Sequence, residues 1–421
     1  MLRTDESSFA KLGASDGFGA DLPRMATASC ATMSLARVLS GNGAMAMGRQ
    51  VQRCGMIRIA ALQEVTFDHN TLDPELNTFL PRWGGLYAKT CAPAGAADPS
   101  TLTEAEFRLD EDVNARLEQR LGRIHARLRL GLEADHEAQV FGQGINYFHF
   151  ENLPWSHFVI QAALRITGLH GRGRKNATKI AVRSNYIASK NIPPSFDGFS
   201  ILQLSDLHID LSVKAMDRLH QILPSLTYDI CVFTGDYRGQ TFGPYQAALT
   251  GMTSLCRLIQ KPMYGVLGNH DTIRMLPALE EMGIRMLLNE CVPISRDADR
   301  IHLAGVDDAH FYRADNLERA ASEIPAGNFS ILLSHTPEIY QQAAHAEFDL
   351  LLSGHTHGGQ ICLPGQIPIT LDSVLPRRFG SGAWKYHSMV GYTSVGAGCS
   401  IVPARFNCPP EITIHYLQLA S

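Results

Sequence analysis

The stretch LLLSGHTHGGQI, residues 350–361, places two histidines one residue apart directly after an apolar run. Three glycines surround His355 and His357. Glycine permits tight turns and a close approach of the backbone to a ligand. A lone histidine in such a turn is most often a satisfied core or loop residue, so the interpretation depends on whether other parts of the chain share this pattern.

The same pattern recurs from Phe199 onward. Short apolar runs, each interpreted as a buried strand, end in polar turns: FSILQLSDLHI, DICVFTGDYRG, KPMYGVLGNHD, RIHLAGVDD, NFSILLSHTPE and FDLLLSGHTHG. The amphipathic stretch VKAMDRLHQIL lies between the first two. Alternating strands and helices predict a mostly parallel, layered α/β sheet, in which ligands bind at the carboxyl ends of the strands. The strand-like stretches YTSVGAGCSIVP and EITIHYLQL are expected to complete a second sheet.

Five of these strand ends carry side chains of the kinds that can bind metal ions. In chain order they are Asp206 and His208, Asp236, Asn269 with His270 and Asp271, His335, and finally His355 with His357. Each is weak evidence alone, but together they predict a metal site at one edge of the sheet. The set has no thiolate, which excludes a zinc–cysteine site and suits Mn²⁺, Fe, Mg²⁺ or catalytic Zn²⁺. It exceeds the needs of one ion, whereas two ions about 3.5–4 Å apart that share a carboxylate would clamp a phosphoryl group.

Composition narrows the class of protein. The 421 residues are 45% hydrophobic and 19% charged, as in a globular chain, and the length favours two units. A formal net charge of −4 gives no support for nucleic acid as the main partner. Nine cysteines without a CxxC pair argue against a disulfide framework and favour a reducing compartment.

The N-terminal part carries no chemical motif. Residues 1–55 are predicted to be disordered or leader sequence, and residues 56–185 a mainly helical region of unknown role. A helix is predicted from an apolar stripe and begins near Thr101 or Thr103; the stripe consists of Val113, Leu117, Leu121, Ile124, Leu128 and Leu132. The arginines on its other sides are interpreted as a solvated face, with an anionic partner left open; they are Arg116, Arg120, Arg123, Arg127 and Arg129.

Residues 155–179 leave two interpretations open. The segment WSHFVIQAALRITGLHGRGRKNATK combines a short apolar stretch with a basic flank. It suits a helix docked on the protein's own core with a solvated basic loop. It also suits an interfacial helix that contacts anionic lipid, which would give peripheral membrane contact.

The blocks SDLH, TGDY, GNHD, SHTPE and GHTH, in this order, resemble the calcineurin-like metallophosphoesterases. The stretches LLNE (287–290), AGVDD (304–308) and GHTHGGQI (354–361) are most similar to the YkuE-like bacterial branch. The resemblance covers roughly residues 190–420. It implies an α/β fold in the form of a four-layer αββα sandwich, preceded here by a mainly helical N-terminal region.

The resemblance also implies roles for single residues. One metal ion would be held by Asp206, His208, Asp236 and His357, and a second by Asp236, Asn269, His335 and His355, so that Asp236 bridges the two. His270 would donate a proton to the leaving group, with Asp271 orienting it. An alternative role for Asp271 is the N-cap of the helix that follows.

Several positions depart from the family or remain open. GDYRGQ and GNHD differ from the GDxVDRG and GNHE blocks of protein Ser/Thr phosphatases, so that activity is disfavoured. Arg238 could contact a substrate phosphate or lie on the surface. Asp307 and Asp308 could position the sheet edge or the substrate, and the structural role is favoured. Many YkuE-like chains have an N-terminal transmembrane helix, of which this chain shows no clear sign.

The expected activity is hydrolysis of phosphomonoesters or phosphodiesters by a hydroxide that bridges two divalent ions, with Mn²⁺ expected and Fe, Zn²⁺ or Mg²⁺ open. The substrate would be a small or lipid-linked phosphoester, such as a nucleotide or UDP-diacylglucosamine. The expected location is cytoplasmic, with peripheral contact to the inner face of the membrane left open. The alternative functions are a non-catalytic metal-binding scaffold and a membrane-surface interaction protein.

Overall fold

The structure is a computed structural model, which describes residues 104–142 and 156–420. Contacts between Cα atoms group residues 97–421 into one compact unit. The described helices therefore belong to the same unit as the sheets. The predictions made for residues 1–55 and for a helix start at Thr101 or Thr103 lie outside the described residues.

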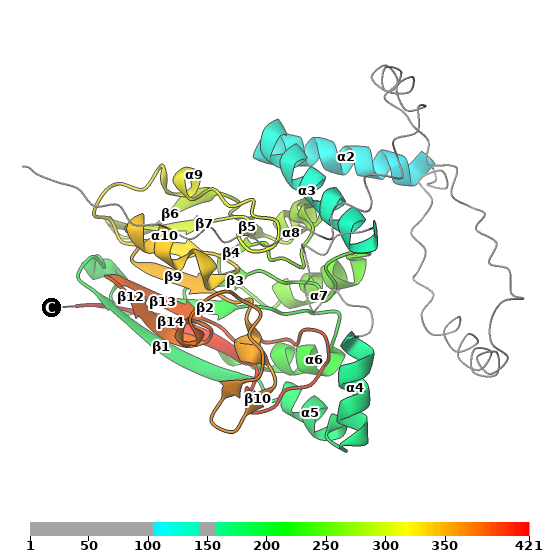
Figure 1. Ribbon diagram of the computed structural model, residues 1–421. Coiled ribbons are helices and arrows are strands. Elements are labelled where there is room, and N and C mark those ends of the chain that lie inside the picture. The colour runs from blue at the N-terminus through cyan, green and yellow to red at the C-terminus, as the bar shows by residue number, and fades with distance from the viewer. Residues whose placement is uncertain (1–103, 143–155, 421) are drawn as a thin grey trace, which may run out of the picture. The chain divides into compact units, whose positions relative to one another are not determined.

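The first sheet has six strands and contains the first and last strands of the unit (Figure 1). Its order is β1 (Ala181–Ser189), β14 (Glu411–Leu419), β2 (Ser200–Leu204), β3 (Ile230–Thr234), β4 (Met263–Val266) and β5 (Ile284–Met286). The strands from β2 to β5 run parallel, and β14 pairs antiparallel to β2 and parallel to β1. Because β1 begins at Ala181, the sheet starts upstream of the boundary predicted at residue 190.

The second sheet also has six strands. Its order is β12 (Gly382–Tyr386), β13 (Met389–Thr393), β9 (Leu350–Ser353), β8 (Ser330–Leu333), β7 (Asp299–Gly305) and β6 (Glu290–Arg296). The four central strands run parallel, and the two edge strands are antiparallel to their neighbours. A short hairpin of β10 (Cys362–Leu363) and β11 (Ile367–Pro368) follows β9.

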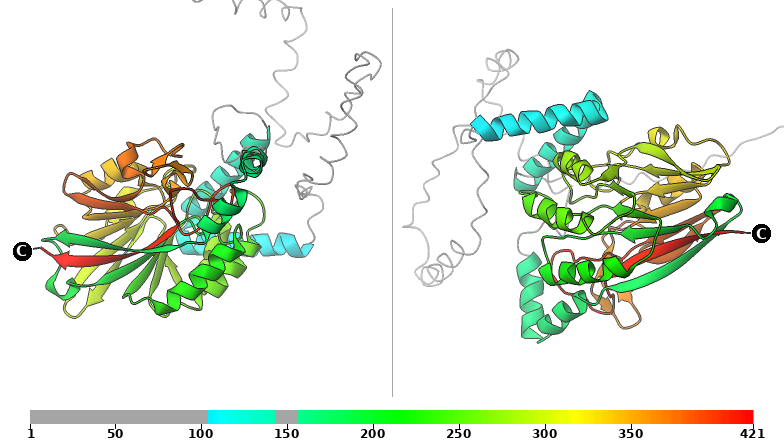
Figure 2. Two further views of the ribbon diagram at one scale, coloured as in Figure 1. Left: turned by 90° about the horizontal axis from the view of Figure 1, so that it is seen from below. Right: turned by 180° about the vertical axis from the view of Figure 1, so that it is seen from behind.

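The two sheets pack face to face, with helices on both outer faces (Figure 2). Alternate residues of each strand face opposite sides, so Ile201 and Val232 meet Ile331 and Leu352 in the central core. The outer face of the first sheet packs on α6 (Val213–Ile222), α7 (Gln246–Cys256) and α8 (Leu276–Glu281), and that of the second sheet on α9 (Leu317–Ala321) and α10 (Tyr340–His345). The four-layer αββα sandwich predicted from the sequence is confirmed.

The predicted N-terminal helix is two helices. Helix α2 (Glu104–Leu121) and helix α3 (Arg123–Gly142) are separated at Gly122, whose φ of 85° favours glycine. The break rotates the apolar stripe, so Leu117 and Leu121 are buried in the core whereas Ile124 is 78% exposed. The prediction of one continuous stripe was wrong beyond residue 122, because periodicity alone does not reveal a helix break.

Four of the five arginines of the predicted solvated face pair with acidic residues of the chain; they are Arg116, Arg120, Arg127 and Arg129. Arg120 pairs with Glu280 and Glu290, and Arg129 is fully buried. Arg116, Arg123 and Arg127 are exposed and fit the prediction of a solvated face. The interpretation as a solvated face was therefore wrong for Arg120 and Arg129, which anchor the helices to the sandwich.

Helix α4 (Ser156–Ile166) and helix α5 (His170–Ala177) form the segment for which two interpretations were open. Leu164 is buried against Val402 and Ala404, so one face of α4 is docked on the protein's own core. On the described helices no segment is long and apolar enough to cross a membrane.

Candidate metal centre

The predicted ligands meet at one edge of the sandwich. They follow directly on the carboxyl ends of β2, β3, β4, β8 and β9, which belong to both sheets. All of these side chains are nearly or fully buried; they are Asp206, His208, Asp236, Asn269, His335, His355 and His357. The structure thus brings together every residue that the sequence singled out as a metal ligand.

The backbone is strained at this edge. Five of the seven residues have a positive φ, which residues other than glycine rarely adopt; they are Asp206, His208, Asp236, His355 and His357. Strain of this kind persists where the surrounding structure enforces it, and it clusters at functional sites. The fold therefore holds these turns in an unfavourable backbone conformation that directs the side chains toward one another.

A first group of donors surrounds the Asp206 and Asp236 carboxylates. Asp206, His208, Asp236 and His357 each offer one ligand atom, and these atoms lie within 4.8 Å of one another. The Nε2 atoms of His208 and His357 are 3.0 Å apart. His208 donates its Nδ1–H to the Arg238 carbonyl at 2.8 Å, so its Nε2 presents a lone pair to the group.

A second group shares Asp236 with the first. The Oδ1 atom of Asn269 lies 2.8 Å from His335 Nε2 and 2.9 Å from His355 Nδ1. His335 Nε2 is also 3.3 Å from Asp236 Oδ2, while its Nδ1–H donates to the Thr234 carbonyl. When His335 is neutral, its Nε2 and the oxygens of Asn269 and Asp236 are all acceptors, and a cation between these three atoms would satisfy them.

The pKa values of the buried ligand residues are shifted because several ionisable groups lie close together. Burial raises the pKa of Asp206 to about 7. Burial alone would also raise the pKa of Asp236, but His335, His270 and His208 hold it well below its usual value. Burial would lower the pKa of His335, yet Asp236 raises it to about 10. Without a metal ion, a proton on His335 is what balances the buried carboxylates, and this is the charge that a divalent cation would replace. The donor set therefore fits divalent metal ions.

His270 lies beside this cluster. Its backbone N–H donates to Asp236 Oδ1 at 3.0 Å, and its Nε2 is 4.0 Å from Asp236 Oδ2. Its ring packs edge-on against that of His208, with ring centroids 4.9 Å apart. The imidazole thus borders the cluster, close enough to reach a phosphoester held there.

Asp271 has a different environment from the predicted one. Both carboxylate oxygens accept backbone N–H groups, from Asp236 and Gly268 at one oxygen and from Tyr237 at the other. The carboxylate braces the turn that carries Asp236 rather than the His270 ring. The alternative N-cap role was also wrong, since the residue that caps the following turn is Thr272, which accepts from the Arg274 amide.

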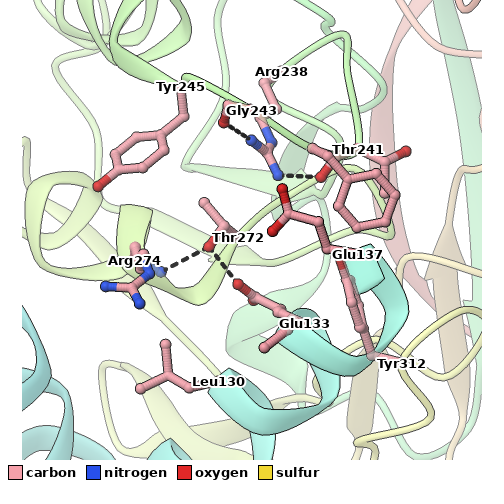
Figure 3. A pocket seen from close by; sticks show the side chains of 12 residues that line it. Leu130, Glu133, Glu137, Arg238, Thr241, Gly243, Tyr245, Thr272, Arg274 and Tyr312 are labelled. Carbon is pink, nitrogen blue, oxygen red and sulfur yellow. Dashed lines mark hydrogen bonds between the residues drawn. The ribbon is translucent and has the colours of Figure 1, made fainter. Parts of the chain in front are cut away.

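Arg238 does not lie on the surface. It is 3% exposed, and its guanidinium donates to the carbonyl groups of His270, Thr241 and Gly243. A close-up of the neighbouring pocket shows the last two bonds (Figure 3). Arg238 therefore ties the loop after β3 to the backbone of His270.

The aspartates after β7 have the structural role that the sequence favoured. Asp307 accepts from Arg129 and lies 3.0 Å from His125 Nε2, so it anchors helix α3. Asp308 accepts the backbone N–H groups of His310, Phe311 and Tyr312.

The sequence did not reveal His310. Its ring centroid lies 4.2 Å from that of His355, and its Nδ1 is 2.8 Å from Glu338 Oε2. His310, His355 and Asp372 form a further group with metal-ligand spacing. The available signal was its place five residues after the end of β7, a sixth strand end at the same edge.

An αββα sandwich with buried carboxylate, imidazole and amide ligands at the carboxyl ends of its strands defines a metal-dependent hydrolase site. Comparison with known proteins agrees. The family model of calcineurin-like phosphoesterases matches residues 199–359. The chain is 30% identical over 259 residues to the uncharacterized metallophosphoesterase YkoQ of Bacillus subtilis, which covers 58% of this chain and 93% of YkoQ.

Two further relatives extend the comparison. The uncharacterized metallophosphoesterase YkuE of Bacillus subtilis is 32% identical over 253 residues, 57% of this chain and 86% of YkuE. The phosphodiesterase YaeI of Escherichia coli is 25% identical over 232 residues, 51% of this chain and 81% of YaeI. The chain belongs to the calcineurin-like metallophosphoesterases and is a metal-dependent phosphoesterase, as its motifs predicted.

Proposed function

We propose that the protein hydrolyses phosphodiesters with two divalent metal ions, of which Mn²⁺ is the expected one. The first ion would lie among Asp206, His208, Asp236 and His357, and the second among Asp236, Asn269, His335 and His355. The observation that carries the proposal is the position of Asp236 Oδ2, which lies 3.6 Å from His208 Nε2 and 3.3 Å from His335 Nε2, between the two groups. When bound, two such ions supply Lewis acidity and lower the pKa of a water molecule so that it can attack phosphorus in line.

The residues around the ligands prepare this reaction. Backbone N–H groups hold Asp206 and Asp236, from His355 and His270 respectively, so both carboxylates stay aimed at the cluster. Burial of the cluster excludes bulk water, which strengthens every charge interaction within it. His270 is placed to give a proton to the departing alkoxide. Asp271 and Arg238 act on the backbone of the two turns that carry Asp236 and His270.

A phosphodiester is favoured over a monoester as the substrate class. YaeI, a relative that matches half of this chain, is named as a phosphodiesterase. The cluster also has a cavity of about 110 Å³ beside His355 and His357, with Ile160 and Val402 in its lining. This apolar side suits the lipid part of a lipid-linked phosphoester such as UDP-diacylglucosamine, whereas a nucleotide is the competing substrate.

Peripheral contact with the inner face of a membrane belongs to the same proposal. Helix α4 and the residues that follow it expose Val159, Ile166 and Leu169, with exposed fractions of 50%, 86% and 39%. The basic residues of and beside α5 are exposed as well; they are Arg172, Arg174, Lys175 and Lys179. Apolar side chains beside basic ones suit the surface of anionic lipid. Flotation of the whole protein with vesicles containing anionic lipid tests this, with Ile166→Ser as the variant; wild-type protein that stays unbound refutes it.

The activity is tested with bis-p-nitrophenyl phosphate and Mn²⁺. We expect turnover that stops on chelation, returns with Mn²⁺, and is abolished in Asp236→Ala. Elemental analysis of the same preparations distinguishes the alternative function, a scaffold that binds metal without catalysis. Two ions per chain without turnover on any phosphoester would favour the scaffold, and turnover that survives both chelation and the substitution would refute the mechanism.

A further inference from the structure

Helix α3 is bound to the segment that follows His270. The Arg129 side chain is fully buried and lies on the inner face of α3. Its guanidinium donates to Asp307 Oδ1 at 3.3 Å, to Glu133 Oε1 at 2.7 Å and to the Asp271 carbonyl at 3.2 Å. One side chain of α3 thus contacts both the strand end after β7 and the backbone next to His270.

Glu133, one turn further along α3, holds the next two residues. It accepts the Thr272 hydroxyl at 2.5 Å (Figure 3) and the Ile273 backbone N–H at 2.7 Å. Residues 271–273 are therefore bound to α3 through three consecutive positions. Because the helical turn of residues 273–275 begins here, these bonds also fix its start.

The chemistry of these contacts indicates more than anchoring. A buried ion pair is often no more stabilising than well-packed apolar side chains, because both charges must lose water. Apolar residues at positions 129 and 133 would dock α3 equally well. What charged side chains add is direction, since each bond requires its acceptor at one place. The arrangement therefore fixes the register of α3 against residues 271–273.

His270 is also held at its own backbone. The backbone N–H of His270 donates to Asp236, and its carbonyl accepts from Arg238. Beyond residue 270, the Asp271 carboxylate accepts backbone N–H groups of the turns after β3 and β4, and α3 binds the Asp271 carbonyl, Thr272 and Ile273.

We propose that α3 contributes to the active site. Arg129 and Glu133 are positioning residues that hold the His270 imidazole where it can protonate the leaving group. The inference rests on the proposed role of His270 as proton donor. Helix α3 lies outside the residues matched by the family model, 199–359, so the feature belongs to this chain's own N-terminal region.

The test compares Arg129→Met and Glu133→Gln with Arg127→Met. The control residue lies on the same helix, but it is exposed and pairs with Glu118 at the surface. Hydrogen exchange of metal-free protein, measured by mass spectrometry, reports on the segment without relying on activity. We expect both test variants to lose protection at residues 271–275 while the sheets keep theirs, and the control to match wild type. Unchanged protection in both test variants overturns the proposal.

Kinetics then separate positioning from general damage. Loss of a proton donor matters for poor leaving groups and little for 2,4-dinitrophenolate, which needs no proton. We expect Arg129→Met to lower kcat for a phenyl ester by on the order of 10-fold and for the dinitrophenyl ester by less than about 3-fold, with metal content unchanged. In a His270→Ala background, the same substitution should have no further effect. The proposal is overturned if Arg129→Met lowers kcat equally for both esters. It is also overturned if Arg129→Met causes its full loss of kcat in the His270→Ala background.

The two proposals fail in different ways. If His270→Ala affects both esters equally, the donor role of His270 is refuted, and the exchange measurement still decides whether α3 positions the segment. If His270→Ala lowers kcat for the phenyl ester much more than for the dinitrophenyl ester but Arg129→Met does not, only the role of α3 is refuted.

A cavity carries a second inference. It measures about 210 Å³ and lies between α3 and the loop after β3; its lining includes Leu130, Glu133, Ala134, Glu137, Thr241 and Tyr245 (Figure 3). The Thr241 hydroxyl oxygen is 3.4 Å from His270 Nδ1, so the cavity adjoins the imidazole. The geometry points to a subsite for the leaving alcohol. Its carboxylate, hydroxyl and phenol groups suit a polar alcohol with hydroxyl or amide groups rather than an acyl chain.

Narrowing the cavity tests this subsite. We expect Ala134→Trp to raise KM at least about 10-fold for a diester whose leaving alcohol is a nucleoside, and to leave KM within about 2-fold for dimethyl phosphate, whose leaving alcohol is methanol, since one blocked pocket removes binding only for groups that enter it. The control is Ile124→Trp, which adds the same side chain at an exposed position of α3 outside the lining of this cavity. It should leave KM for both substrates unchanged. Equal KM changes for both substrates in Ala134→Trp overturn the subsite.

Discussion

Substituting Asp236 should remove both metal ions at once. The residue stands between the two ligand groups, with Oδ2 3.6 Å from His208 and 3.3 Å from His335. Asp236→Asn keeps the shape of the side chain and removes its charge. Each bound ion stabilises the folded protein by about 2.7 kcal/mol at a free concentration one hundred times its dissociation constant. Two ions then add roughly 5 kcal/mol, which corresponds to a rise in melting temperature on the order of 10 °C.

The assay is thermal unfolding of chelator-treated protein with increasing Mn²⁺, combined with elemental analysis. Wild-type protein should show the full rise and two ions per chain, and Asp236→Asn should show almost no rise. Single-group variants give the matched comparison. His357→Ala and Asn269→Ala should each retain one ion and about half of the rise. If Asp236→Asn keeps two ions and the full rise, or if either single-group variant loses both, the shared role of Asp236 is refuted.

Three further outcomes follow from buried contacts. In Gly354→Ala, the added Cβ would overlap the Asp206 carboxylate, so metal content measured by elemental analysis should fall with little change in the circular dichroism spectrum. Burial lowers the pKa of His415 to about 3, so its contribution to stability is present above pH 6.5 and is lost as pH falls toward 3. Urea unfolding should therefore show that wild-type protein loses about 2 kcal/mol more than His415→Gln between pH 7 and pH 5. Arg120→Met removes the two short bonds to Glu290 and leaves it the longer contact with Arg285, and urea unfolding should show a loss of about 1–3 kcal/mol, against less than about 0.5 kcal/mol for the exposed Arg127→Met.

The position of the metal ligands could be predicted from the sequence because it depends on topology. A strand that ends in Asp-x-His or His-x-His delivers its side chains to one edge of a parallel sheet, whatever the details of packing. Asp206 and His357 lie far apart in the chain, yet the end of β2 and the end of β9 meet. The alternation of apolar runs and amphipathic stretches predicted a mostly parallel, layered α/β sheet, and the resemblance to the family implied the four-layer sandwich.

The supporting contacts could not be predicted, because they depend on which groups meet across the fold. Arg129 looks like any other arginine of a solvated helix, and only the structure shows Asp307 and the Asp271 carbonyl opposite it. The same holds for Asp271, whose carboxylate finds backbone amides instead of an imidazole. The break at Gly122 was visible as a glycine, but a glycine within a helical pattern does not by itself end a helix.

The order of strands in the first sheet has a consequence for how the protein is made. Strand β14, the last of the described strands to leave the ribosome, is inserted between β1 and β2, which are synthesised long before it. Until then β1 has no neighbour in this sheet and β2 lacks one of its two. The nascent chain therefore has unpaired strand edges until β14 is synthesised, and such edges can pair with other chains. A chain truncated before residue 411 would keep these edges unpaired, because the first sheet is complete only once β14 has been synthesised.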